Sequence, residues 1–292
     1  MSSLATKSLS LRKTPPLTSS EFTNLRNLIY NLSGIDIPER RKYLLENRLG
    51  ARLRALNLKN FGEYFNYLKK TRDKKEELDY LFEKITTNET SFFRDIRQLG
   101  VFRTFVLANV LNARKKTGTK DLNIWCAGCS SGEEAYTISI LLHEFLGPSV
   151  SGWNIRITAN DLSPAMITKA KKGIYNEYSL RNTPRDMIDK YFTPVPEGYK
   201  IDPKIQKPIN FRVMNLKNNS ELKTIPKSHI IFCRNVIIYF DDAMKQQVIN
   251  QFYDNLVPAG YLIIGHSESL HKFSRLFRPL SKPGGIMYQR EQ

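Results

Sequence analysis

The stretch from Asp121 to Tyr136, DLNIWCAGCSSGEEAY, constrains the fold of this chain more than any other part of its sequence. Its apolar residues up to Trp125 form a short run that stops at Gly128, as expected of a buried strand. Small and polar residues follow as far as Gly132, and from Glu133 onward apolar residues recur at helical spacing. The stretch therefore predicts a strand, a tight glycine turn and a helix, which is the basic unit of an α/β fold.

The same turn has the character of a small-molecule site. Glycine has no side chain, so a ligand can approach the backbone closely. The spacing is G-x-x-x-G rather than the dinucleotide fingerprint G-x-G-x-x-G, and Glu133 and Glu134 stand where a phosphate would need the positive helix end. Asp161 ends the next predicted strand, 154–160, and such carboxylates commonly hold ribose hydroxyls. Ribose and a positive charge without phosphate describe S-adenosylmethionine, and a turn that serves chain geometry alone is the alternative.

Composition narrows the class of protein without choosing its partner. A chain of 292 residues can bury two cores, so two domains are expected. The formal charge of +17 attracts anionic partners, whether nucleic acid, membrane or acidic protein. No apolar stretch is long enough for a membrane span and the N-terminus lacks a signal-peptide core, so we expect a cytoplasmic protein.

The three cysteines do not form a recognisable redox or metal motif. Cys126 and Cys129 make one C-x-x-C pair, but a zinc site would need a second pair. Together with Cys233 they are expected to be small buried residues, and no metal site is predicted.

The first third of the chain predicts a helical domain. Residues 1–18 have the composition of a disordered tail, and Ser19 or Ser20 is expected to cap the first of four short helices in a domain spanning 19–85. From Glu39 to Leu56 leucines form one helical stripe. Arginines form another stripe, which is either a solvated face or a binding surface: Arg41, Arg48 and Arg52.

The remainder predicts an α/β domain with one interruption. Residues 86–95 do not resemble an ordinary linker, and Thr90 or Ser91 is expected to cap a helix that continues to Leu111. Ser163-Pro164 predicts another helix start. A small β-subdomain is expected at about 174–209 within a domain spanning 99–292, which ends in a hairpin from Phe277 to Gln289.

Five motifs make the chain similar to a known family. It resembles the CheR-type chemoreceptor glutamate O-methyltransferases in register from about Phe22 to Tyr288. The motifs are TTNETSFFRD (86–95), GCSSGEEAY (128–136), ANDLSPAMITKAKKGIY (159–175), IIFCRNVIIYF (230–240) and GHSES (265–269).

The resemblance implies an α/β fold. Its parts would be a small all-α domain, then a seven-stranded Rossmann-like S-adenosylmethionine-dependent methyltransferase core with an inserted small β-subdomain. Residues 86–98 would join the domains and contact the cofactor. The implied cofactor contacts are Asn88, Thr90, Arg94, one of Glu133 and Glu134 (the latter preferred), Asp161, Asn215, Leu216, Asn235 and Val236. Arg94 and Tyr239 would lie nearest the transferred methyl group.

The implied reaction esterifies glutamate carboxylates of chemoreceptors and releases S-adenosylhomocysteine. The partner would be the acidic helical bundle of a methyl-accepting receptor, so the protein would meet the membrane only through receptors and act as a monomer. A complementary docking surface is expected at Arg41, Arg48, Arg52 and Arg54. Residues 191–198 are about three residues shorter than the loop with which some relatives hold a receptor pentapeptide, so pentapeptide independence is expected.

Two other functions compete with this one. The first is a scaffold that binds the cofactor without turnover. The second is a nucleic-acid methyltransferase, which the charge invites. Such enzymes usually carry an Asn/Asp-Pro-Pro-aromatic wall where this chain has Arg234-Asn235-Val236-Ile237, so no nucleic-acid partner is expected.

Overall fold

The chain divides into two compact units. The computed structural model describes residues 15–70, 74–273 and 276–291, so most of the predicted disordered tail lies outside the described residues. The first unit comprises residues up to Tyr30 together with Ile37–Ile85, and the second comprises Asn31–Asp36 and Thr86 onward.

The first unit is helical. Its first helix is capped by Thr18 rather than by Ser19 or Ser20. Thr18 Oγ1 accepts from the backbone N–H of Glu21 at 3.2 Å, and the Glu21 carboxylate accepts from the backbone N–H of Thr18 at 2.9 Å. This reciprocal capping box orders the chain before Ser19, and Leu17 is buried. The elements are α1 (Ser19–Ser33), η1 (Glu39–Arg41), α2 (Lys42–Ala55), α3 (Phe61–Lys70) and α4 (Lys74–Ile85).

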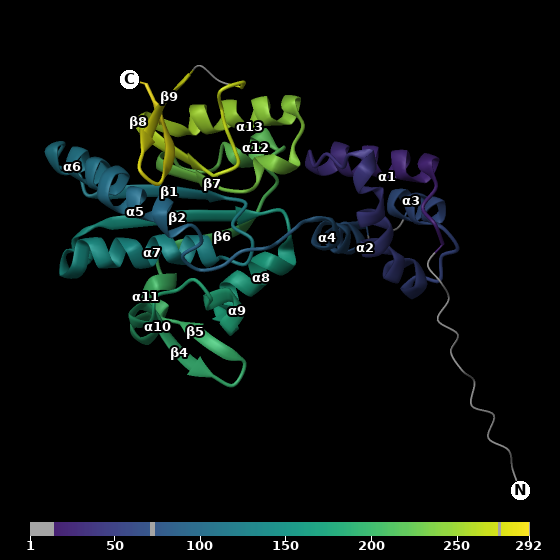
Figure 1. Ribbon diagram of the computed structural model, residues 1–292, viewed down its shortest axis with the longest axis horizontal. Helices are drawn as coiled ribbons and strands as arrows, with labels where there is room; N and C mark the ends of the chain where they lie inside the picture. The colour runs from purple at the N-terminus through teal and green to yellow at the C-terminus, as the bar shows by residue number, and fades with distance from the viewer. Residues whose placement is uncertain (1–14, 71–73, 274–275, 292) are drawn as a thin grey trace, which may run out of the picture. The chain divides into compact units, whose positions relative to one another are not determined.

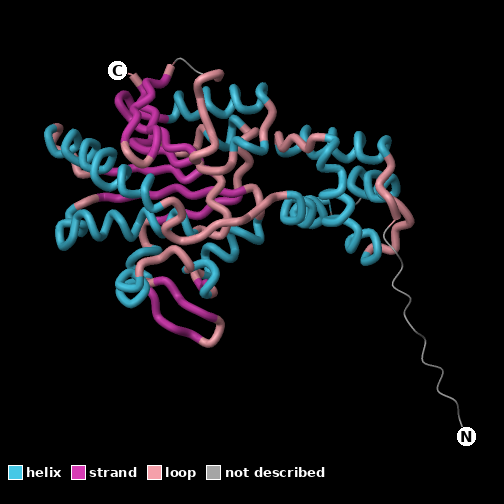
Figure 2. The backbone as a smooth tube through the Cα atoms, in the orientation of Figure 1, coloured by secondary structure: helices cyan, strands magenta, loops and turns pink. Residues whose placement is uncertain are grey.

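The second unit is built on a seven-stranded, mostly parallel sheet among the described residues, as predicted. Figure 2 shows these strands between layers of helices. The five strands from β6 to β8 are parallel, whereas β10 pairs antiparallel with β8 and with β9, which confirms the C-terminal hairpin. The order across the sheet is β6 (Ile209–Val213), β2 (Asn154–Asp161), β1 (Asp121–Ala127), β7 (Ser228–Cys233), β8 (Leu256–Ile264), β10 (Gly285–Arg290) and β9 (Phe277–Lys282).

Both faces are buried at the centre of the sheet, where alternate side chains of β1 enter two different hydrophobic cores. Ile124 and Cys126 face one hydrophobic cluster, and Trp125 and Ala127 face the other. Figure 1 shows α7 and α8 on one side of the sheet and α12 and α13 on the other. The helices outside the insertion are α5 (Ile96–Val101), η2 (Phe102–Leu107), α6 (Ala108–Lys116), α7 (Glu133–Leu146), η3 (Gly147–Gly152), α8 (Pro164–Lys172), α12 (Asn219–Leu222), η4 (Ile237–Tyr239) and α13 (Asp242–Asn255).

Two predicted helix starts have different outcomes. The Ser163 cap is confirmed, since its Oγ accepts from the backbone N–H of Met166. The cap at Thr90 or Ser91 is wrong. The helix begins at Ile96, and Asp95 caps it by accepting from the backbone N–H of Gln98. Just before Asp95 the chain is not helical, and the side chains of Phe92 and Phe93 are buried in the core of the second unit.

A small β-subdomain interrupts the α/β order between α8 and β6. Its three strands form a separate antiparallel sheet in the order β3-β5-β4. Short helices, which the sequence pattern did not reveal, surround this sheet. The elements are β3 (Ile174–Tyr175), α9 (Glu177–Leu180), α10 (Arg185–Tyr191), β4 (Phe192–Val195), β5 (Gly198–Ile201) and α11 (Pro203–Gln206).

Candidate functional site

The site lies where the carboxyl ends of β1, β2 and β7 meet. Parallel strands bring their following loops to one edge of the sheet, and ligands of open α/β sheets bind there. The backbone N–H groups of Gly128 and Cys129 both donate to Asn160 O, at 2.8 and 2.9 Å. These bonds fix the glycine turn against the end of β2.

Asp161 holds the turn from the neighbouring strand. Its Oδ2 accepts from the backbone N–H of Ser130 at 2.8 Å, and its Oδ1 accepts from that of Ser163 at 2.9 Å. Burial raises the pKa of the Asp161 carboxyl, while these backbone hydrogen bonds act in the opposite direction. Each carboxylate oxygen can accept a further hydrogen bond, so Asp161 retains acceptor capacity for a hydroxyl-bearing ligand.

The two acidic residues at the start of α7 have different environments. Glu133 is turned inward, where Ser131 Oγ donates to it at 2.8 Å and Ser179 Oγ at 3.2 Å. Glu134 instead forms an ion pair with Arg234 at 3.2 Å. Burial raises the pKa of both carboxyls, and for Glu134 the nearby Arg234 opposes the shift. Glu134 is therefore the member of the pair whose charge faces other ionised groups of the site.

Arg234 connects three parts of the site, although sequence reasoning did not select it. Besides Glu134, its guanidinium lies 3.8 Å from Asp95 and donates to Arg94 O at 2.8 Å. Its Nε is buried without a hydrogen-bond partner among the described residues. A buried, unpaired donor next to an ion pair fits a site for a zwitterionic ligand. The arginine within the IIFCRNVIIYF motif was the available signal.

The segment that carries Asn88, Thr90 and Arg94 belongs to the same edge of the sheet. Ser130 Oγ donates to Asn88 O at 3.3 Å, and the backbone N–H of Phe93 donates to Thr137 Oγ1 on α7 at 3.1 Å. Arg94 Nη1 donates to Glu89 O at 2.9 Å, which curls the segment back on itself. The structure thus brings this segment against the glycine turn.

Asn215 and Leu216 follow β6 and lie next to the end of β2. Met214 N donates to Asp161 O at 3.0 Å, which places their loop beside that strand end. The side-chain amide of Asn215 makes two hydrogen bonds. Its Nδ2 donates to Leu32 O at 2.7 Å, and its Oδ1 accepts from the backbone N–H of Lys217 at 2.9 Å. Leu216 is buried in the second core cluster. The predicted pair therefore secures the loop that borders the site.

The turn after β7 carries Asn235, Val236 and Tyr239. Asn235 has a positive φ of 60°, and Glu268 holds this strained turn by accepting from the backbone N–H groups of Asn235 at 2.9 Å and Gly265 at 2.6 Å. Tyr239 lies half-buried in η4. Glu268 of the GHSES motif is the second residue that sequence reasoning missed, because the motif gives no sign that its carboxylate contacts the distant Asn235.

The four predicted docking arginines belong to the first unit and divide into two kinds. Arg52 forms an ion pair with the buried Glu77 at 2.5 Å, and Arg48 donates to Ile85 O at 2.7 Å, so both join α2 to α4. Arg41 and Arg54 have exposed side chains. Only part of the predicted stripe is thus a solvent-facing surface.

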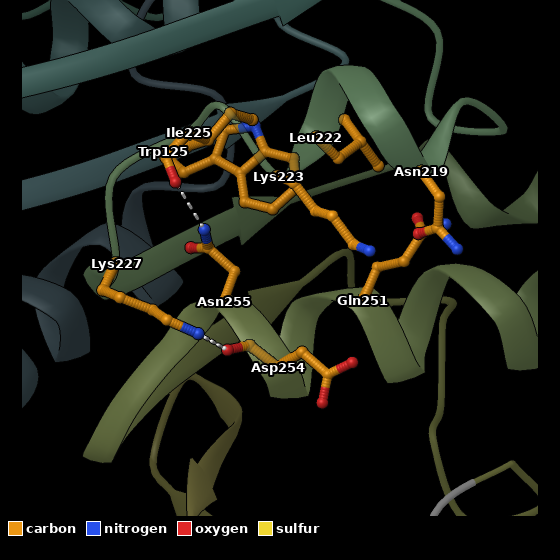
Figure 3. Close-up of a pocket in the computed structure, with 9 residues that line it drawn as sticks. All are labelled: Trp125, Asn219, Leu222, Lys223, Ile225, Lys227, Gln251, Asp254 and Asn255. Atoms are coloured by element: carbon orange, nitrogen blue, oxygen red, sulfur yellow. Dashed lines mark hydrogen bonds between the residues drawn. The ribbon is translucent and has the colours of Figure 1, made fainter.

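A separate cavity of about 140 Å³ has none of the predicted site residues in its lining. Figure 3 shows it between α12 and the C-terminal end of α13, near the start of β7, whereas the candidate site is at the opposite end of that strand. The side-chain amide of Gln251 lines its wall but is inaccessible to solvent and has no partner among the described residues. The cavity therefore has no part in the site described above.

Within the described ranges, the chain offers no cluster of three or more histidine, cysteine or acidic side chains placed to hold a metal ion. All three cysteines are buried and none forms a disulfide. None of the helices that can be described is long and apolar enough to cross a membrane.

Comparison with known proteins identifies the family. The profile described as "CheR methyltransferase, all-alpha domain" matches residues 20–86, and the one described as "CheR methyltransferase, SAM binding domain" matches residues 88–286. The chain belongs to the CheR methyltransferase family. Its second unit is therefore an S-adenosylmethionine-binding domain, and the predicted cofactor and fold are confirmed.

Several bacterial chemotaxis methyltransferases resemble this CheR-family chain over almost its whole length. The chemotaxis protein methyltransferase of Borreliella burgdorferi is 33% identical over 87% of this chain and 89% of its own. Chemotaxis protein methyltransferase 2 of Vibrio cholerae is 34% identical over 89% of each chain. The Escherichia coli chemotaxis protein methyltransferase is 33% identical over 93% of this chain and 91% of its own.

Proposed function

We propose that this protein transfers the methyl group of S-adenosylmethionine to glutamate side chains of chemoreceptors, giving the glutamate 5-O-methyl ester and S-adenosylhomocysteine. The observation that carries the proposal is the similarity of both domains to proteins named chemotaxis protein methyltransferases. The chemistry of the strand-end site supports it independently.

The site offers complementary groups for each part of the cofactor. Asp161 can accept from ribose hydroxyls, Glu134 can pair with the amino group of the methionine part, and Arg234 Nε can donate to its carboxylate. The space that holds the cofactor would be bordered by Asn88, Thr90, Asn235 and Val236. Beyond β2 it would be bounded by Asn215 and Leu216. When bound, the cofactor supplies an electrophilic methyl carbon on a sulfonium.

A glutamate substrate needs little further activation. Its pKa of about 4.3 leaves it ionised at neutral pH, so no general base is required. The carboxylate oxygen would attack the methyl carbon, so that a C–O bond would form as the C–S bond breaks and sulfur would keep the bonding pair. Arg94 would orient the carboxylate through charge-assisted hydrogen bonds and Tyr239 would donate to it. Alignment of this kind supplies roughly 7–11 kcal/mol in favourable cases.

The inserted sheet supports pentapeptide independence. β4 and β5 are joined tightly, with Val195 paired to Gly198 across a two-residue loop. β4 is an outer strand and contains Pro194, which has no N–H to offer to an added strand. A receptor peptide that extends this sheet at β4 would lose that hydrogen-bonding position.

A labelling experiment tests the function. The purified protein is incubated with methyl-labelled S-adenosylmethionine and with membranes that contain chemoreceptors. The receptor protein is then isolated and treated with base. Methyl esters release the label as volatile methanol. Base-stable label would indicate nitrogen methylation, and absence of label despite cofactor binding would indicate a scaffold. Either result would refute the proposed reaction.

A further inference from the structure

The start of the inserted subdomain contacts both loops of the candidate site. Tyr175 on β3 is fully buried and donates through its hydroxyl to Ser131 O at 2.6 Å, in the glycine turn. Ser179 Oγ on α9 donates to Glu133 Oε1 at 3.2 Å. The backbone carbonyl oxygen of Ser179 accepts from the backbone N–H of Phe92 at 2.9 Å. This short stretch is therefore a brace between the glycine turn and the 86–95 segment.

Arg181, immediately after α9, holds the same segment further along. Its Nη2 donates to Glu89 Oε1 at 2.6 Å, and its Nη1 lies 3.4 Å from Thr90 O. The guanidinium lies over the Tyr178 ring at 3.9 Å from the centroid, and the Tyr178 hydroxyl donates to the same Glu89 oxygen at 3.0 Å. The stacking and the shared carboxylate fix the direction of the guanidinium.

The next residue extends this arrangement. Asn182 Nδ2 donates to Ser91 Oγ at 3.0 Å. Positions 89 to 92 are thus each held by the α9 region, through Glu89, Thr90, Ser91 and Phe92 in turn. The segment has no regular secondary structure of its own. Its placement therefore depends on side-chain contacts of this kind.

We infer that Arg181 is a positioning residue for the cofactor site, acting through the 88–94 segment rather than by touching the cofactor. The inference rests on the proposed roles of Asn88, Thr90 and Arg94. Without Arg181 the segment would lose its tie at Thr90 and one of the two ties at Glu89, where only the Tyr178 hydroxyl would remain, and the cofactor would have to order the segment on binding. Ordering a loop during binding weakens affinity without changing the chemical step.

Calorimetric titration of the whole chain with S-adenosylhomocysteine tests the positioning role of Arg181. R181A is expected to bind about three- to fivefold more weakly, because the contacts are partly exposed, while kcat at saturating cofactor is unchanged. R181K is expected to lie between R181A and the wild type. R185A is the matched control: Arg185 is an exposed arginine on the neighbouring helix whose ion pair is with Asp189, on its own helix.

A double-mutant cycle with E89Q separates positioning from general destabilisation. The effects of R181A and E89Q on the dissociation constant should be less than additive, since both remove the same ion pair. Unchanged binding by R181A, or full additivity, would overturn the inference. Because the ligand is the demethylated cofactor, the readout stays valid even if no glutamate ester is formed.

Discussion

Arg234 Nη1 lies 3.2 Å from Glu134 Oε2, and both side chains are almost excluded from solvent. The pair joins the end of β7 to the first turn of α7. Through its bond to Arg94 O, the same guanidinium also holds the 86–95 segment. One ion pair therefore connects three segments that are distant in the sequence, at the place where the cofactor is expected to bind.

Breaking that pair should affect stability and cofactor binding together. R234M removes the ion-pair partner of the mostly buried Glu134, and breaking a buried pair in this way typically costs about 3–5 kcal/mol. Urea unfolding and S-adenosylhomocysteine titration of R234M measure the two losses. R156M changes an exposed arginine on β2 and serves as the control. Equal stability of R234M and R156M would contradict the assigned role of the pair.

Gly128 is expected to tolerate no side chain. A Cβ there would lie 2.4 Å from Val236 Cγ2, and the residue has a positive φ of 75°. G128A should therefore lose about 1–3 kcal/mol of unfolding free energy. G118A isolates the clash, because Gly118 has a φ of 70° but nothing within 4 Å of the added Cβ. V236A should partly rescue G128A, and absence of any rescue would show that the clash is not the cause.

His229 should contribute to loss of stability in acid. Its Nδ1 accepts from the backbone N–H of Asn123 at 3.0 Å, which requires the neutral ring, and burial lowers its pKa. Below the unfolded-state pKa of about 6.5, the unfolded chain binds a proton that the folded chain resists, so stability falls as the pH falls. The loss ends once the pH is below the folded-state pKa.

The free energy of unfolding, measured with a chemical denaturant at a series of pH values from about 8 to about 5, gives the contribution of His229. H229Q should lose less stability over that interval than the wild type. Buried carboxylates shift the curve of both proteins alike, so the difference reports on His229. H271Q, at an exposed position, should follow the wild type. Identical slopes for H229Q and wild type would refute the assignment.

The arginine stripe should separate into structural and docking members. R52A removes the partner of the buried Glu77 and should destabilise the protein by about 3 kcal/mol in urea unfolding. R41E together with R54E should leave cofactor affinity unchanged, while receptor methylation falls. Unaltered methylation by the double variant would place the docking surface elsewhere.

Local patterns made much of the fold predictable. The strand, glycine turn and helix around Gly128, the cap at Ser163 and the C-terminal hairpin each have a signature within a few residues. The contacts of Arg234 and Glu268 had none, because they join segments that are distant in the chain. Arg52 illustrates the same limit: helical periodicity placed it on a charged stripe but did not reveal the facing Glu77.

The most direct test of the account is a crystal structure of this protein with S-adenosylhomocysteine. We expect the ribose at Asp161 and the amino group of the ligand beside Glu134, against the turn from Gly128 to Gly132. A ligand bound elsewhere, for example in the cavity beside Gln251, would contradict the central claim that the β1, β2 and β7 strand ends form the methyl-donor site.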